Sequence, residues 1–71
     1  LVAGEDGLVF FRRLVREAPA FLAPGGFLGV EVGIGQAPAV AELFRQAGLA
    51  DVAVHPDTAG VERAVFGSVA P

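Results

Sequence analysis

The chain has 71 residues, of which 54% are hydrophobic, and a formal net charge of −3. This length allows at most one small domain, and the acidity argues against a nucleic-acid surface, which depends on clustered Lys and Arg. The absence of Cys excludes a disulfide scaffold and a thiolate metal site. The longest uncharged run, 18–30, is broken by Pro and Gly, so no membrane segment is expected. Because the chain begins with Leu1 rather than Met, we expect it to be a fragment of a longer protein.

Residues 7–22 predict an amphipathic helix. Apolar side chains recur there at three- and four-residue spacing, and three Arg and a Glu fall on the opposite side. Asp6 is expected to cap the first turn, since its carboxylate can accept hydrogen bonds from exposed backbone N–H groups. Pro19 lacks a backbone donor and is expected to kink or restart the last turn.

The remaining elements alternate strand, helix, strand, strand. The short apolar run 27–33 is typical of a strand covered on both faces, as in parallel α/β sheets. A second amphipathic helix is predicted over 37–47, a short strand over 52–55, a turn over 56–60, and a last strand over 62–69. The connection 55–62 is too short for another crossover, so the last strand should return antiparallel. We therefore predict an α/β fold with the order α-β-α-β-β, in which the last strand lies between the other two.

Gly33 and Gly35 raise the question of a cofactor loop. A dinucleotide fingerprint needs a third glycine three residues after the second and an acidic residue at the end of the next strand. Pro38 occupies the position of the third glycine, and Asp51 precedes the next strand. The glycines are therefore interpreted as an ordinary strand-to-helix turn.

Other chemical groupings are weak. His55, Asp57 and Ser68 have the residue types of a hydrolase triad, but Ser68 has no nucleophile elbow around it. One His with scattered acidic residues gives no metal-ligand spacing, so no metal site is predicted. The basic cluster of the first helix is read as a solvated face, with a partner-docking patch as the alternative; its members are Arg12, Arg13 and Arg16.

Glu31 is unusual because it lies near the carboxyl end of an apolar strand. Such ends open toward the ligand crevice in open α/β sheets. A buried, unpaired charge costs several kcal/mol, so Glu31 should face either that crevice or an arginine. We expect a salt bridge with Arg63 on the adjacent antiparallel strand, which does not exclude contact with substrate.

Four short motifs, in this order, resemble the carboxyl-terminal part of the release-factor-specific protein-(glutamine-N5) methyltransferases, the HemK-type family. They are a helix start, a Pro-Gly-Gly turn, a strand ending Glu-x-Gly followed by Gln, and a final Asp-x-x-Gly-x-x-Arg return. Their positions are Gly4, Asp6, Gly7 and Leu8; Pro24, Gly25 and Gly26; Glu31, Gly33 and Gln36; and Asp57, Gly60 and Arg63. Ala3 departs from the family pattern, which usually shows a glycine there.

The resemblance implies that residues 1–71 are the carboxyl-terminal part of a catalytic domain with a class I S-adenosylmethionine-dependent methyltransferase (Rossmann-like) fold. It implies a cytoplasmic enzyme that methylates a glutamine side chain of peptide-chain release factors. The family's cofactor loop and its Asn-Pro-Pro-Tyr motif lie upstream of this segment. We therefore expect no catalytic, cofactor-binding or metal-binding residue in the chain, which alone should be inactive and bind S-adenosylmethionine weakly or not at all. Glu31, Gly33, Gln36 and Arg63 are expected at the rim of the substrate crevice.

Two alternatives stay open at this point. The chain could be a free-standing, non-catalytic interaction module, or part of a methyltransferase that acts on nucleic-acid base amines, although its acidity disfavours the latter. No nucleic-acid or membrane partner is expected. We also expect the chain alone to self-associate through the unpaired edge of strand 27–33 or through helix 7–22.

Overall fold

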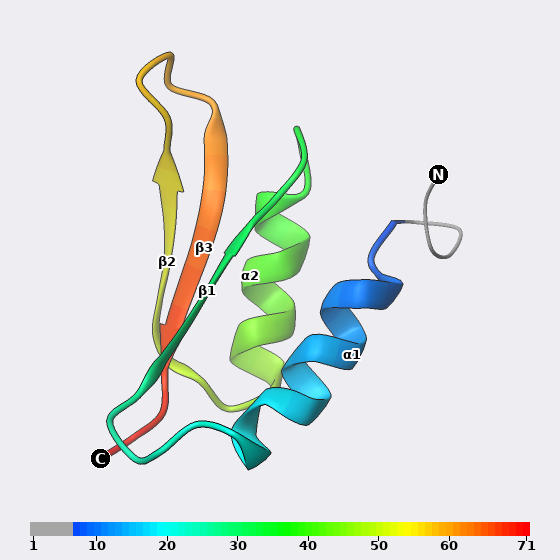
Figure 1. Cartoon of the computed structure of the whole chain (residues 1–71). Helices are drawn as coiled ribbons and strands as arrows, with labels where there is room; N and C mark the ends of the chain where they lie inside the picture. Colours follow the sequence, from blue (N-terminus) through cyan, green and yellow to red (C-terminus); the bar gives the residue numbers. More distant parts are fainter. Residues whose placement is uncertain (1–6) are drawn as a thin grey trace.

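The structure is a computed structural model that describes residues 7–71. It contains two helices, a short 3₁₀ helix and three strands, which gives the predicted order α-β-α-β-β (Figure 1). Their bounds are α1 Val9–Glu17, η1 Ala18–Ala20, β1 Phe27–Glu31, α2 Ala37–Gln46, β2 Ala50–Pro56 and β3 Glu62–Ser68. The expected cap Asp6 lies outside the described residues.

The predicted helix 7–22 divides into two parts. The α-helical part ends at Glu17, and the following 3₁₀ turn has Pro19 in its first turn. The change from α to 3₁₀ geometry follows from the missing N–H of proline, which removes one α-helical hydrogen bond. The prediction that Pro19 restarts the last turn is confirmed.

The three strands form one sheet in the order β1-β3-β2. β3 is antiparallel to both neighbours, with Glu31 opposite Ala64 and His55 also opposite Ala64. The last strand therefore lies between the other two, as the short connection after β2 predicted. Both helices cover the same face of this sheet (Figure 1).

β2 is longer than the predicted strand 52–55. It begins at Ala50 because the chain enters the sheet through an irregular start, where Asp51 has a φ of 54° and the pairing register shifts before Ala53. Only Asn, Asp and Gly adopt such a φ readily, so Asp51 suits this irregularity.

The core lies between α2 and the sheet, and α1 closes it at one side. Phe44 and Val40 of α2 and Val65 of β3 are the largest fully buried side chains. Phe11 and Val15 of α1 join the same apolar cluster. The apolar stripes of both predicted helices therefore point to one core.

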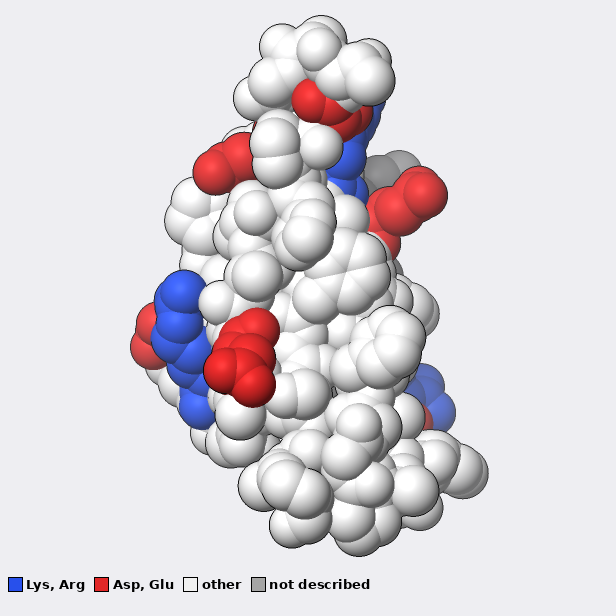
Figure 2. All heavy atoms as spheres, turned by 90° about the vertical axis from the view of Figure 1, so that its left-hand side faces the viewer, with Lys and Arg blue, Asp and Glu red and all other residues white. Residues whose placement is uncertain are grey.

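The expectation that residues 27–33 are covered on both faces is wrong for the part of the chain that the structure describes. Residues of β1 alternate between exposed and half-buried, and Phe27 is 70% exposed. The physical reason is that both helices lie on one face, so the other face of the sheet has no cover. Figure 2 shows this open face, most of which carries no charged group.

Candidate functional site

The carboxyl ends of β1 and β2 lie at the same end of the sheet because both strands are antiparallel to β3. The turn from β1 to α2, which contains Gly33 and Gln36, lies at this end, and so does the hairpin turn from β2 to β3. In open α/β sheets this is the end at which ligands bind. The rim residues expected from the sequence are therefore brought to one end of the molecule.

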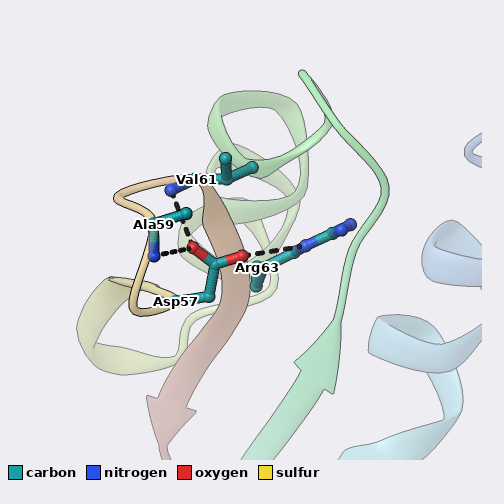
Figure 3. Close-up of polar contacts among 4 residues, drawn as sticks. All are labelled: Asp57, Ala59, Val61 and Arg63. Carbon is teal, nitrogen blue, oxygen red and sulfur yellow. Dashed lines mark hydrogen bonds and ion pairs between the residues drawn. The ribbon is translucent and has the colours of Figure 1, made fainter.

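Asp57 organises the hairpin turn (Figure 3). Its Oδ1 accepts hydrogen bonds from the N–H of Ala59 at 2.8 Å and from the N–H of Val61 at 3.0 Å. Its Oδ2 forms an ion pair with Nε of Arg63 at 3.5 Å. Gly60, with a φ of 85°, provides the left-handed residue that this turn requires.

These contacts favour the charged form of Asp57. The hydrogen bond from the Val61 N–H is the main cause that holds the pKa of Asp57 below its ordinary value; desolvation acts in the opposite direction. The Ala59 N–H and the Arg63 guanidinium lower the pKa further. Asp57 is thus a fixed anion at the tip of the hairpin.

The expected ion pair between Glu31 and Arg63 is wrong, since Arg63 pairs with Asp57 instead. Glu31 lies opposite Ala64, and the Val32 N–H donates to the Arg63 carbonyl at 2.9 Å. Directly opposite residues share one face of a sheet, and successive residues alternate faces, so Glu31 and Arg63 point to different faces. Glu31 is also exposed, so its charge needs no buried partner.

A surface hollow of about 530 Å³, here called the corner hollow, nevertheless lies where β1 ends and β3 begins. Its lining residues are Glu31, Val32, Asp57, Arg63 and Ala64. The Arg63 side chain extends from the hairpin toward the segment that follows β1 (Figure 3). Two acidic residues and one arginine thus border the hollow beside the carboxyl end of β1, although Glu31 and Arg63 point to opposite faces of the sheet.

Gln36 is the last residue before α2, and its side-chain amide is bonded at both ends. Oε1 accepts a hydrogen bond from the Gly33 N–H at 2.8 Å, and Nε2 donates to the Gly7 carbonyl at 3.3 Å. Gly7 is 29 residues away in the chain. Gln36 therefore joins the turn after β1 to the segment that enters α1.

The Gly33 to Gln36 segment is a strand-to-helix turn, as predicted. The Gln36 N–H donates to the Gly33 carbonyl at 3.0 Å, Gly35 has a φ of 83°, and Pro38 lies in the first turn of α2. Within this turn the Gly33 N–H already donates a hydrogen bond to the Gln36 side chain. It is therefore not available to bind a phosphate.

The hydrolase-triad residue types are not brought together. The Ser68 hydroxyl donates to the Ala50 carbonyl at 3.1 Å at one end of the sheet, whereas Asp57 lies in the turn at the other end. The ring of His55 contacts that of Phe66, with centroids 4.8 Å apart. His55 is exposed, which confirms its interpretation as a surface residue.

The basic cluster of α1 is exposed. Arg13 pairs with Glu17 of its own helix at 3.1 Å. Arg12 and Arg16 border a shallow hollow between α1 and α2, together with Leu43. An exposed pair within one helix contributes only a few tenths of a kcal/mol, so this face is consistent with a solvated surface.

Two further features are absent from the chain from residue 7 onward. No group of three or more His, Cys, Asp or Glu residues there could hold a metal ion. None of the described helices has the length and apolar composition needed to cross a bilayer.

Known proteins resemble this chain along nearly its whole length. It is 45% identical to the release factor glutamine methyltransferase of Geobacter sulfurreducens, over 97% of this chain and 24% of that protein. The protein of the same name from Synechocystis is 48% identical over 92% of this chain and 22% of its own length. No protein-family model matches the chain.

A solved structure agrees with these sequence matches. The crystal structure of the release-factor-specific protein-(glutamine-N5) methyltransferase from Alicyclobacillus acidocaldarius covers all of this chain with a TM-score of 0.75 at 35% identity. The match takes up 45% of that chain.

The resemblance and the fold class drawn from the sequence are thus confirmed. All three of these similar proteins are named as glutamine methyltransferases that act on release factors. The chain spans about a quarter of the length of the curated relatives that it matches.

Gln36 and Asp57 were both predicted as motif residues, but their hydrogen-bonding roles in the two turns were not. An Asp two residues before a small residue and three before Gly is a known turn signal, and it could have indicated the Asp57 turn. Nothing in the sequence signalled that the Gln36 amide would reach Gly7, because that contact depends on how α1 packs beside α2.

Proposed function

We propose that this chain is the carboxyl-terminal part of a methyltransferase that uses S-adenosylmethionine to methylate a glutamine side-chain amide of peptide-chain release factors. The observation that carries the proposal is the similarity over nearly the whole chain to release factor glutamine methyltransferases, with the same fold in a solved relative. The activity belongs to the longer enzyme, because this chain corresponds to about a quarter of such relatives. Its place of action would be the cytoplasm, where release factors function.

In this proposal the cofactor supplies an electrophilic methyl group. Bound in the longer enzyme, it would transfer this methyl group with cleavage of the methyl–sulfur bond, while the glutamine amide nitrogen would form the new bond and release one proton. The residues of this chain do not perform the transfer. We assign Glu31, Gly33, Gln36 and Arg63 to the rim of the substrate crevice, and the support is that all four lie at the end of the sheet where β1 and β2 finish, with Glu31 and Arg63 bordering the corner hollow.

The activity is tested with a chimera in which this chain replaces the matching segment of the Geobacter sulfurreducens relative. We expect the chimera to transfer a labelled methyl group to a release factor. The control is the same relative carrying a scrambled segment of equal composition. Transfer to nucleic acid in place of release factor would contradict the proposal, as would a folded chimera without activity.

The isolated chain should not hold the cofactor by itself. The N–H of Gly33 in its glycine turn is bonded to Gln36, and Asp57, which directly follows β2 where a ribose-binding acid is expected, already accepts hydrogen bonds within its own hairpin turn. Calorimetric titration of the chain with S-adenosylmethionine is expected to give no measurable heat of binding, and the full chimera serves as the positive control. A dissociation constant in the micromolar range, a binding free energy of about −8 kcal/mol, would contradict this expectation.

The isolated chain should also self-associate. β1 is an edge strand that pairs with β3 alone among the described strands, and Phe27 on it is 70% exposed. Phe21 beyond α1 is also exposed, whereas Phe11 is buried. An unprotected apolar edge is a template for pairing with a second chain. Light scattering at about 100 μM, well above a micromolar affinity, should give a mass above that of the monomer; a monomer would refute this.

A further inference from the structure

The amide of Gln36 lies between two glycines that leave room for it. A Cβ added to Gly33 would lie 3.1 Å from Oε1 of Gln36, and one added to Gly7 would lie 3.1 Å from Nε2. Such separations are closer than side-chain carbons normally allow. Gly7 also has a φ of 72°, a conformation that favours glycine. The absence of a Cβ at Gly7 and at Gly33 thus leaves the space that the Gln36 amide occupies.

The contact between Gln36 and Gly7 differs from the hydrogen bond that the side-chain amide of Gln46 makes within α2. Gln46 donates to Glu42 within α2 at 3.4 Å, and both residues are exposed. Gln36 instead bridges 29 residues, and its donor side is part-buried. A part-buried bond that joins distant segments restricts their relative position, whereas an exposed bond within one helix does not.

The bridge lies at the end of the sheet where open α/β folds bind ligands. One partner, Gly33, belongs to the turn that follows β1; the other, Gly7, belongs to the segment that enters α1. The side chain of Gln36 therefore links Gly7, just before α1, to the turn at the carboxyl end of β1.

We propose that Gln36 is a positioning residue, which fixes the segment entering α1 against the turn after β1 and so sets the geometry of the substrate crevice. This inference rests on the proposed function. It gives Gln36 a role through its two backbone contacts and assigns it no contact with the substrate. Displacement of a positioning group by about 1 Å can lower a rate 100-fold, so loss of the bridge should reduce turnover more than substrate binding.

Two substitutions of Gln36 distinguish its hydrogen bond to Gly33 from its hydrogen bond to Gly7. Gln36→Glu keeps the length and the acceptor for the Gly33 N–H, but places a second acceptor against the Gly7 carbonyl. Gln36→Met keeps the approximate volume and removes both bonds. Gln46→Ala, on the exposed side of α2, is the matched control.

The first measurement is hydrogen exchange of the Gly33 amide in the chimera labelled with ¹⁵N-glycine. We expect the amide to stay protected in Gln36→Glu and to exchange at least about 10-fold faster in Gln36→Met, since local opening controls this rate. Exchange in Gln36→Met within about two-fold of the unsubstituted chimera would overturn the bridge.

The second measurement is the kinetics of methyl transfer to release factor. Both Gln36 variants should lower kcat by about 10- to 100-fold with KM within about three-fold, and Gln46→Ala should change neither. Unchanged kcat in Gln36→Glu would overturn the positioning role. A chimera that is inactive before any substitution would count against the proposed function, while the exchange of Gly33 would still decide whether the bridge exists.

Discussion

Truncation of Phe44 to alanine tests whether the core lies where the structure places it. Phe44 is fully buried in α2, and a Cβ added to Gly67 of β3 would lie 3.0 Å from its Cδ2 atom, so the ring fills the space between helix and sheet. Removal of a buried Phe ring costs about 3–5 kcal/mol, from lost transfer free energy and from the cavity that remains. The fully buried neighbours Val40 and Val65 limit how far that cavity can collapse.

This loss is large for a chain of 71 residues. Typical stabilities of 0.05–0.15 kcal/mol per residue correspond to roughly 4–11 kcal/mol here. Urea unfolding followed by circular dichroism should therefore show Phe44→Ala with a midpoint lowered by about 3 M or with no folded baseline, at a slope near 1 kcal/mol/M. Phe21→Ala, at a position 82% exposed, should change the midpoint little. Equal effects of the two substitutions would refute this description of the core.

Two more substitutions test the hairpin and the helix–sheet contact. The pKa of Asp57 is lowered from 3.8, so its contribution to stability is present above that pH and is lost as pH falls through the lower folded-state value. Asp57→Asn should therefore reduce the fall in urea midpoint between about pH 5 and pH 2, and an unchanged pH profile would contradict the assignment. Gly67→Ala should destabilise by about 1–3 kcal/mol, because the new Cβ would lie 3.1 Å from the Leu49 Cβ; a gain in thermal stability would show that the site can relax.

The order of elements could be predicted because each helix carries a periodic apolar stripe. The place of β3 could also be predicted, since the connection from His55 to Glu62 is too short for a crossover. The change of helix type at Pro19 follows from a covalent property of proline and needs no tertiary information.

The site was harder to predict because register and packing decide it. Glu31 pairs with Ala64, one residue away from Arg63, and this shift of one residue places Glu31 and Arg63 on different faces of the sheet. The sequence alone does not determine the pairing register to within one residue. The cover of β1 was overestimated because a continuous apolar run does not say how many layers surround it. The bridge from Gln36 to Gly7 depends on the packing of two helices, which local patterns do not determine.

The central position of β3 has a consequence for synthesis on the ribosome. β1 and β2 share no hydrogen bonds with each other, and each pairs with β3, which is made after both of them. Vectorial translation therefore delivers β1, α2 and β2 before the strand that joins them. Until Ser68 has emerged from the exit tunnel, the edge of β1 that will pair with β3 has unpaired backbone groups and can bind other chains. A pause in translation between β2 and β3 would lengthen that interval, and chaperones that bind extended apolar segments would have their best access then.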